Sequence, residues 1–268
     1  MSDGGKARLL VVVSYYNARP DNNLRDLLAS MESSEAGVDF DVCLVVNQEP
    51  GVATKPAFAQ LQYQHGRENA GMNIGAWDMG WRQHPDYSYY LFLQDECLIV
   101  SPGWGKAFVD GMQQAGVGLV TESINRRWDR PWKDLERKRK GGKVMREGHG
   151  RQMGDASFYQ AFMRRCGIDP GATGRHARAL VWGIPGAVMR KIGGFPIGYS
   201  YAECIASEIA VSRKIEAIGY RIVQLREKPF SFIHHVEWAN ERKAHTECCL
   251  FSRMLSRVIS KLGKGRNR

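Results

Sequence analysis

A continuous apolar run near the start of the chain, Leu9–Ser14, constrains the fold more than any other segment. A strand that is apolar at nearly every position is buried on both faces, which is typical of a parallel sheet covered by helices. Two further runs of strand length follow at Val42–Val46 and Tyr89–Leu93, and apolar residues recur at helical spacing over 24–31 and 73–82. Strands that alternate with helices predict a mostly parallel α/β sheet flanked by helices.

The hydrophobic patterns of the other segments are less regular. Residues 54–64 are compatible with a short helix, whereas residues 121–178 are rich in Arg, Lys and Gly and have little periodicity. We therefore expect a long excursion there, of the kind that carries binding rather than core packing. Apolar order returns at 179–189, and later patterns predict a helix and two short strands: 208–218, 220–223 and 230–233.

The chain of 268 residues is long enough for one large domain, which we place at 1–235 with the excursion 121–178 inside it. Residues 236–268 form a predicted C-terminal extension. Within it, apolar residues recur at helical spacing between Leu250 and Leu262, and basic residues occupy the opposite face. This pattern predicts an amphipathic helix.

The net charge of +10 is concentrated in two segments. Residues 126–146 carry a net +7 and residues 253–268 a net +6, so the remainder is slightly acidic. Such segments bind nucleic acid, anionic lipid or phosphorylated substrates. The C-terminal helix could therefore dock on the domain, form a homodimer or lie on an anionic membrane surface.

The chain has no apolar stretch of the length that a membrane span needs, and its polar start, Met1–Lys6, is unlike a signal peptide. We expect a cytoplasmic protein, peripheral at the inner face of the membrane if the C-terminal helix binds lipid. The six cysteines have no CxxC spacing and lie mostly in apolar segments. They predict reduced, mostly buried thiols rather than a disulfide framework or a zinc site.

Two adjacent carboxylates, Asp95 and Glu96, end the apolar run Tyr89–Leu93. Open α/β sheets bind ligands at the carboxyl ends of their strands. Hard oxygen ligands at that position suit Mg²⁺ or Mn²⁺ holding a substrate diphosphate. An acidic turn exposed to solvent is the alternative interpretation of this pair.

Several common catalytic motifs are absent from the sequence. It contains no GxxxxGK, no GxGxxG after the first strand, no GxSxG and no HExxH. The chain therefore lacks the usual signatures of hydride-transfer enzymes, kinases and hydrolases. A nucleic-acid-binding module is disfavoured, because neither basic segment matches a known motif.

In chain order, the remaining motifs resemble those of GT-A nucleotide-sugar glycosyltransferases, and within them glycosyltransferase family 2. The first strand ends in Tyr16-Asn17, with Ser14 where the family usually has Pro or Thr. The second strand ends in Asn47, where an Asp normally contacts the nucleobase or ribose. The segment that contains Asn69, Gly71 and Asn73 resembles the family's Asn- and Gly-rich segment.

The resemblance continues through the acidic motif and the second half. Gln94-Asp95-Glu96 lies where the family has its metal motif, so that either Asp95 or Glu96 could be the direct ligand. The segment 182–195 ends in Gly-Gly-Phe, after which the family has an acidic catalytic base. Glu203 and Glu208 are the candidates, and we rank Glu203 slightly higher. His234 or His235 would complete the metal shell or contact the diphosphate.

The resemblance implies a GT-A, Rossmann-like fold and an inverting, metal-dependent transfer of sugar from a nucleoside diphosphate sugar to an acceptor hydroxyl. The donor would contact Ser14, Tyr16, Asn47, Asn69, Gly71, Asn73 and Asp95. The basic segments suggest a glycan or lipid-linked acceptor, such as a polysaccharide precursor at the membrane. A nucleotidyltransferase and a non-catalytic nucleic-acid-binding protein are the alternative functions.

Overall fold

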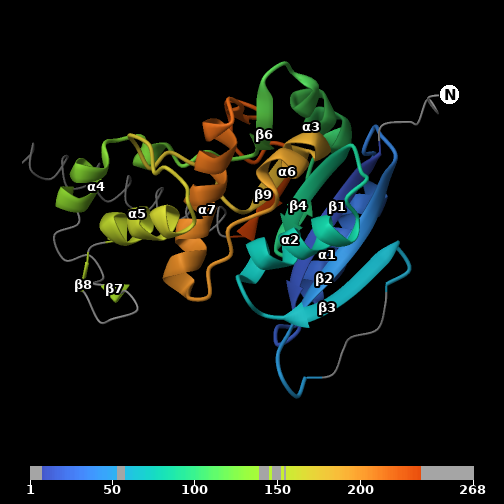
Figure 1. The fold of residues 1–268 in the computed structure, drawn as a ribbon. Coiled ribbons are helices and arrows are strands. Elements are labelled where there is room, and N and C mark those ends of the chain that lie inside the picture. Colours follow the sequence, from blue (N-terminus) through green and yellow to red (C-terminus); the bar gives the residue numbers. More distant parts are fainter. Residues whose placement is uncertain (1–7, 53–57, 139–144, 147–151, 154, 237–268) are drawn as a thin grey trace, which may run out of the picture.

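The computed structural model describes residues 8–52, 58–138, 145–146, 152–153 and 155–236. Its centre is a seven-stranded sheet with the order β10-β6-β9-β4-β1-β2-β3 (Figure 1). In chain order the strands of this sheet are β1 (Leu9–Tyr16), β2 (Phe40–Gln48), β3 (Tyr63–Glu68), β4 (Tyr89–Gln94), β6 (Val117–Thr121), β9 (Val181–Pro185) and β10 (Arg221–Gln224).

The sheet is mostly parallel, as the sequence predicts. Within it β1 pairs in parallel with β2 and β4, and β2 pairs in parallel with β3. β9 runs antiparallel to both β4 and β6, so that its first residue lies beside the end of β4. The predicted α/β fold class is confirmed, and it is the architecture that the GT-A resemblance implies.

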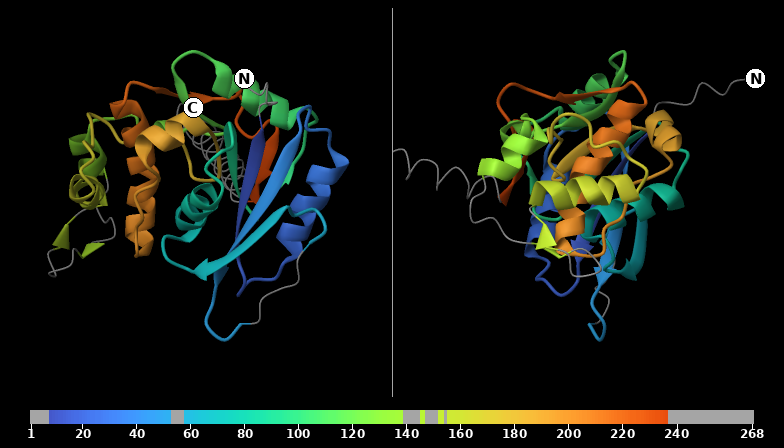
Figure 2. Two further views of the ribbon diagram at one scale, coloured as in Figure 1. Left: turned by 45° about the vertical axis from the view of Figure 1, so that its right-hand side comes forward. Right: turned by 60° about the vertical axis from the view of Figure 1, so that its left-hand side comes forward.

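Helices cover both faces of the sheet, and Figure 2 shows α1 and α2 on opposite sides of it. The residues of β1 alternate between the two layers, with Leu9, Val11 and Val13 on one face and Leu10 and Val12 on the other. The first layer contains α1 (Asn22–Ser33) and α3 (Trp104–Gln113), and the second contains α2 (Met72–Gln83), α6 (Gly186–Ile192) and α7 (Tyr201–Ala217). Burial on both sides explains why β1 is apolar throughout.

The predicted excursion 121–178 contains more regular structure than its sequence indicates. It includes a 3₁₀ turn, η1 (Arg126–Trp128), two helices, α4 (Trp132–Lys138) and α5 (Asp155–Arg165), and the short strands β7 (Met145–Arg146) and β8 (Gln152–Met153). Phe158, Phe162 and Met163 of α5 pack with Ile209 of α7 in a separate apolar cluster. The excursion therefore adds a helical layer outside α7 (Figure 1).

Other boundaries differ from the predictions. The described part of the segment 54–64 contains no helix: residues 58–62 form turns and irregular structure, and 63–64 begin strand β3, which pairs with β2 at the sheet edge. Helix α7 begins seven residues before the predicted start at 208. The predicted strand 230–233 is displaced to β11 (Ile233–His235), which pairs antiparallel with β5 (Cys97–Ile99). The predicted helix of the extension lies outside the described residues.

Candidate active site

Polar side chains gather where β1 and β2 end. Ser14 is buried, and its hydroxyl lies 3.3 Å from Oδ1 of Asn73, at the start of α2. The amide of Asn47 donates to the carbonyl of Met72 at 3.2 Å and accepts from Arg67 at 2.9 Å. The hydroxyl of Tyr16 donates to the carboxylate of Glu49. In this structure these groups hold the loops around the strand ends.

The turn before α2 brings backbone close to this edge. Gly71 has φ +77°, and a Cβ there would lie 2.6 Å from Cγ2 of Ile197. Only glycine tolerates both this conformation and this contact without strain. Asn69 is exposed, whereas Asn73 is half-buried and faces Ser14. Of the predicted donor residues of this turn, Gly71 and Asn73 line the cavity described below, whereas Asn69 does not.

Asp95 lies in the turn between β4 and β5, and its backbone N–H donates to the carbonyl of Ser14 at 3.0 Å. Only 6% of the residue is exposed. Burial raises the pKa of its carboxyl to about 6, and the charge of Glu96 raises it further while that of Arg19 opposes the shift. Removal of this carboxylate from water is costly unless a cation meets it.

Glu96 already has a cationic neighbour. Its Oε1 accepts from the guanidinium of Arg19 at 2.9 Å. The sequence near Asp95 and Glu96 gave no sign of such a partner, because Arg19 is 77 residues away and reaches them from the loop after β1. Arg19 is thus a further positive group at this edge of the sheet.

Of the two candidate histidines, His235 faces the carboxylates. Its Nε2 lies 3.9 Å from Oε2 of Glu96 and 3.1 Å from Oε1 of Gln94, to which it donates. Burial lowers the pKa of His235 to about 4, so its ring is neutral at pH 7. His234 is exposed, because successive side chains of a strand point to opposite sides.

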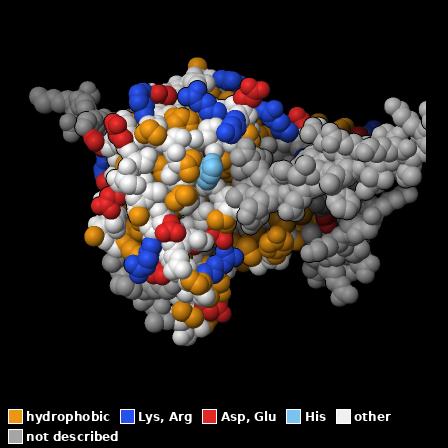
Figure 3. All heavy atoms as spheres, turned by 180° about the vertical axis from the view of Figure 1, so that it is seen from behind, with side chains coloured by type: hydrophobic (Ala, Val, Ile, Leu, Met, Phe, Trp, Pro, Cys, Tyr) orange, Lys and Arg blue, Asp and Glu red, His pale blue; other side chains and the backbone are white. Residues whose placement is uncertain are grey.

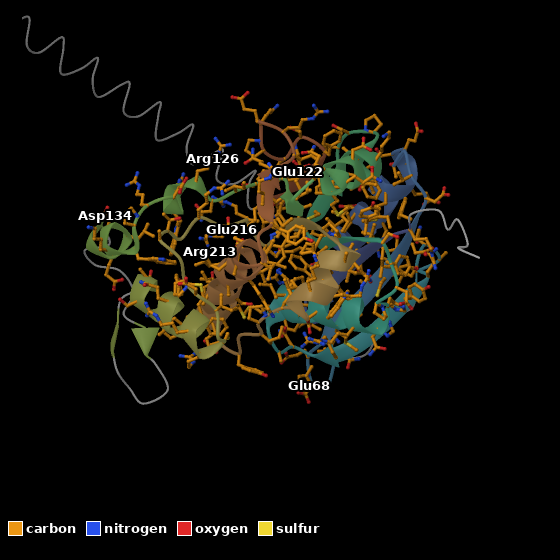
Figure 4. The ribbon with its side chains drawn as sticks, turned by 45° about the horizontal axis from the view of Figure 1, so that its top comes forward. Glu68, Glu122, Arg126, Asp134, Arg213 and Glu216 are labelled. Carbon is orange, nitrogen blue, oxygen red and sulfur yellow. The ribbon has the colours of Figure 1, made fainter. Side chains whose placement is uncertain are left out.

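A buried carboxylate fixes the segment that carries His235. Glu122, directly after β6, accepts from the backbone N–H groups of Ser231, Phe232 and Ile233, each at 2.9 Å. Figure 4 shows Glu122 beside the sheet, where the last described segment crosses it. Glu122 therefore sets the position of β11, a role that no pattern in the sequence indicated.

A cavity of about 350 Å³ opens next to Gln94, between the start of α2 and helix α7. Of the residues predicted to act, it contains Gly71, Asn73 and Glu208. The rest of the wall includes Met72, Ile74, Gln94, Ala179 and Leu180, together with side chains of the excursion and α7 that were not individually predicted: Asn125, Trp128, Tyr159, His176, Arg178, Tyr201, Cys204 and Ile205. The excursion was expected to carry binding, but its sequence pattern did not indicate that these side chains converge.

Glu208 faces this cavity from α7. Its Oε1 accepts from the backbone N–H of Ala179 at 2.6 Å and lies 3.8 Å from Nε2 of His176. Burial raises the pKa of Glu208 to about 7, while the Ala179 hydrogen bond and the charge of Arg178 oppose the shift. His176 is neutral at pH 7, because burial lowers its pKa to about 4. A carboxylate in this state can accept a proton near neutral pH.

Hydrogen bonds connect Glu208 to Gln94, the residue directly before the turn that carries Asp95 and Glu96, here called the carboxylate turn. Gln94 accepts from His235, and its amide donates to the carbonyl of Ala179 at 2.6 Å. The N–H of Ala179 in turn donates to Glu208. Gln94 thus lies between the carboxylate turn and the cavity, although Asp95 and Glu96 do not line the cavity.

Glu203, which the sequence ranked above Glu208, is engaged elsewhere. Its Oε2 accepts from the N–H of Ser200, whose hydroxyl accepts from the N–H of Glu203, which is a capping box at the start of α7. Its Oε1 accepts from Arg165 of α5 at 2.8 Å. Glu203 is not among the residues that line the cavity.

The carboxylate turn carries residue types that bind divalent ions, but among the described residues the structure brings three potential ligand atoms within 4.8 Å of one another only at Cys43, His65 and His84. Asp95 and Glu96 offer hard oxygen ligands, and the neutral imidazole of His235 lies within 4 Å of Glu96. Carboxylate oxygens suit Mg²⁺ and Mn²⁺, and imidazole is an acceptable additional ligand for Mn²⁺. The raised pKa of Asp95 reflects a burial cost that a cation would offset.

No protein-family model matches the chain, and no curated protein matches it. Among solved structures it is similar to a mannosyltransferase from Pyrobaculum calidifontis in complex with GDP-Man and Mn²⁺, with a TM-score of 0.49 and 13% identity over 84% of this chain and 56% of that one. It is also similar to WbbM, a bifunctional glycosyltransferase, with a TM-score of 0.45 and 11% identity over 84% of this chain and 40% of that one. The chain spans only about half the length of these two proteins.

No helix in the part of the chain that the structure describes is both long and apolar enough to cross a membrane.

Proposed function

We propose that this chain is a metal-dependent glycosyltransferase that moves a sugar from a nucleoside diphosphate sugar to a hydroxyl of a glycan or glycolipid. One observation carries the proposal: the buried turn with Asp95 and Glu96 is joined through Gln94 to a cavity that contains Glu208, with its pKa near 7. A cation-binding turn beside a carboxylate with this pKa matches the needs of nucleotide-sugar transfer.

The donor would lie across the ends of β1, β2 and β4, where open α/β sheets bind nucleotides. Asn47 and Tyr16 would contact the nucleoside from the β2 side, and Ser14, Asn69, Gly71 and Asn73 would form the rim next to the diphosphate. Arg19 is exposed on one side and could pair with phosphate oxygens in place of Glu96.

Asp95 and Glu96 would hold the divalent ion, and His235, whose Nε2 lies 3.9 Å from Oε2 of Glu96, would assist them. When bound, Mn²⁺ or Mg²⁺ would neutralise the charge that develops on the departing diphosphate. His234 would not contribute from its exposed position. In this structure Nε2 of His235 donates to Gln94, and this nitrogen would have to give up that hydrogen bond to bind the ion.

Glu208 would act as the general base. Its carboxylate would accept the proton of the acceptor hydroxyl as that oxygen attacks the anomeric carbon, whose bond to the diphosphate breaks in the same displacement. A single displacement inverts the configuration at this carbon. Trp128, Tyr159 and Tyr201 would offer apolar ring faces to the acceptor sugar.

A panel of nucleotide sugars, with and without Mn²⁺, tests the proposal by thermal shift and by transfer to glycan acceptors. A ligand at a hundredfold its Kd should stabilise the fold by about 2.7 kcal/mol. Glu208→Gln should keep donor binding and lose transfer by roughly 10²–10⁴-fold. Glu203→Gln is the matched control, and should lower stability while transfer by the folded enzyme persists.

Two results would contradict the proposal. Near-parental turnover by Glu208→Gln would exclude this residue as the base. The absence of a Mn²⁺-dependent shift with every nucleotide sugar would exclude the donor class and favour the nucleotidyltransferase or nucleic-acid alternatives.

We also propose attachment to an anionic membrane through the C-terminal extension. On the face that Figure 3 shows, Lys and Arg side chains of the described residues lie among Asp and Glu, so the support comes from the sequence of 253–268. Six basic residues there could each contribute on the order of 1 kcal/mol near anionic lipid. Truncation after Cys249 should abolish salt-sensitive sedimentation with anionic liposomes, and an unchanged result would leave docking or a homodimer.

A further inference from the structure

Three side chains of types that can bind metals lie close together near the C-terminal end of α2, away from the carboxylate turn. Cys43 lies on β2 and is fully buried, His65 lies on the edge strand β3, and His84 caps the C-terminus of α2. One ligand atom from each lies within 4.8 Å of the other two. β2 continues for five residues beyond Cys43, so the cluster is about 17 Å along the strand from the end that faces the proposed active site.

The two imidazoles direct the same atom toward each other. Nε2 of His65 and Nε2 of His84 are 2.9 Å apart, so one nitrogen donates a proton to the other. Burial lowers the pKa of both rings, and the charge of His65 also disfavours a charged His84. Both rings are therefore neutral at pH 7, which is the form of histidine that binds metals.

The ligand atoms lie within 4.8 Å of one another, so a tetrahedral ion would draw Sγ of Cys43 toward the imidazole nitrogens by up to about 1 Å. Bonds of about 2.0–2.1 Å to nitrogen and 2.3 Å to sulfur separate the ligand atoms by roughly 3.3 Å between nitrogens and 3.6 Å between nitrogen and sulfur. The two Nε2 atoms would move apart by a few tenths of an ångström from 2.9 Å. Small side-chain rotations provide such a shift.

Surrounding groups hold the ring of His84 in place. The ring of Tyr63 stacks on it with centroids 3.8 Å apart, and the hydroxyl of Tyr63 bonds to that of Tyr87. Tyr90 donates its hydroxyl to the carbonyl of His84 at 2.6 Å. Ligand rings in metal sites are commonly oriented by such outer contacts.

We propose that Cys43, His65 and His84 form a second metal site, for a borderline-soft divalent ion of the Zn²⁺ class, with water as the fourth ligand. A thiolate and two imidazoles prefer such an ion to Mg²⁺ or Mn²⁺. The ion would join β2, the edge strand β3 and the end of α2. The spacing of the cysteines gave no signal for it, because the three ligands come from three elements.

Titration of chelator-treated, full-length protein with Co²⁺ tests the site independently of sugar transfer. Co²⁺ in a tetrahedral thiolate site gives a sulfur-to-metal charge-transfer band that an oxygen-rich site does not give. We expect this band to saturate at one ion per chain and Zn²⁺ to abolish it. Burial raises the pKa of Cys43 to about 12, so binding at neutral pH should release the thiol proton to solvent.

Variants identify the ligands. Cys43→Ala should abolish the charge-transfer band, and His84→Phe, which retains a ring against Tyr63, should weaken Co²⁺ binding at least tenfold. Cys166→Ser, which changes an exposed thiol outside the cluster, and Asp95→Asn should leave the band unchanged. Circular dichroism checks that each variant is folded. A parent without the band, or a band that persists in Cys43→Ala, would overturn the proposal.

Discussion

The carboxyl of Asp95 should destabilise the metal-free fold at neutral pH, and Asp95→Asn should therefore stabilise it. Burial moves the pKa of this group from 3.8 to about 6. The folded chain thus binds the proton more tightly than the unfolded chain does. The free energy of unfolding must fall as pH rises from about 4 to about 6, and it stays lower above that range.

The shift corresponds to about 3 kcal/mol, since one pKa unit is 1.36 kcal/mol. Asparagine has nearly the same shape and no charge, so Asp95→Asn should gain about 2–3 kcal/mol at pH 7 and little at pH 4. Urea denaturation at both pH values, without divalent ions, measures the difference. Asp110→Asn, on the exposed face of α3, is the control and should change stability by less than about 0.5 kcal/mol.

Saturating Mn²⁺ should make the parent more stable than Asp95→Asn, which is the reverse of their order without the ion. The parent gains stability from the ion, whereas Asp95→Asn has lost a charged ligand and should gain little. If Asp95→Asn is less stable than the parent at pH 7, burial of the ionised Asp95 carboxylate does not destabilise the fold. If both proteins respond equally to Mn²⁺, the carboxylate turn is not the ion site.

Two further substitutions test how the site is held. Gly71→Ala should destabilise the fold by about 2–3 kcal/mol in thermal or urea unfolding, because the new Cβ would clash with Ile197 and the backbone has a positive φ. Gly219→Ala is the control: its φ is also positive but the space around it is open, so it should cost only about 1 kcal/mol. Glu122→Ala should lower the free energy of unfolding by about 2–4 kcal/mol, because it leaves three backbone N–H groups unpaired, and it should speed hydrogen exchange at 231–233. Glu227→Ala changes an exposed residue and should have neither effect. If Gly71→Ala cost no more than Gly219→Ala, the contact with Ile197 would be refuted, and if Glu122→Ala cost no more than Glu227→Ala, the hydrogen bonds of Glu122 would not hold the segment 231–233.

The central strands were predictable because burial on both faces leaves a continuous apolar run in the sequence. β3 was not, since it lies at the sheet edge and its sequence, Tyr63–Glu68, is mostly polar. α5 was missed although Phe158, Phe162 and Met163 have helical spacing, because its basic and glycine-rich surroundings obscured the pattern. Helices that pack on other helices leave weaker signals than strands in a sheet centre.

The order of Asp95 and Glu96 after a buried strand was enough to place the carboxylate turn. The choice between Glu203 and Glu208 was not settled by distance from Gly-Gly-Phe. A local signal did exist, because Ser200 and Glu203 have the three-residue spacing of a capping box. The environment of Glu208, in contrast, depends on Ala179 and His176, which only the fold brings to α7.

If Glu208 is the base, the rate of transfer should rise with pH around 7 and level off above it, because only the carboxylate accepts the acceptor proton. The positive charge of Arg178 lowers the pKa of Glu208. Arg178→Met should therefore move the inflection of the kcat profile to higher pH, by up to about one unit. Arg175→Met is the control, since Arg175 lies next to Glu216 rather than Glu208, and it should leave the inflection in place. An inflection that stays fixed in Arg178→Met, or moves equally in both variants, would mean that another group titrates.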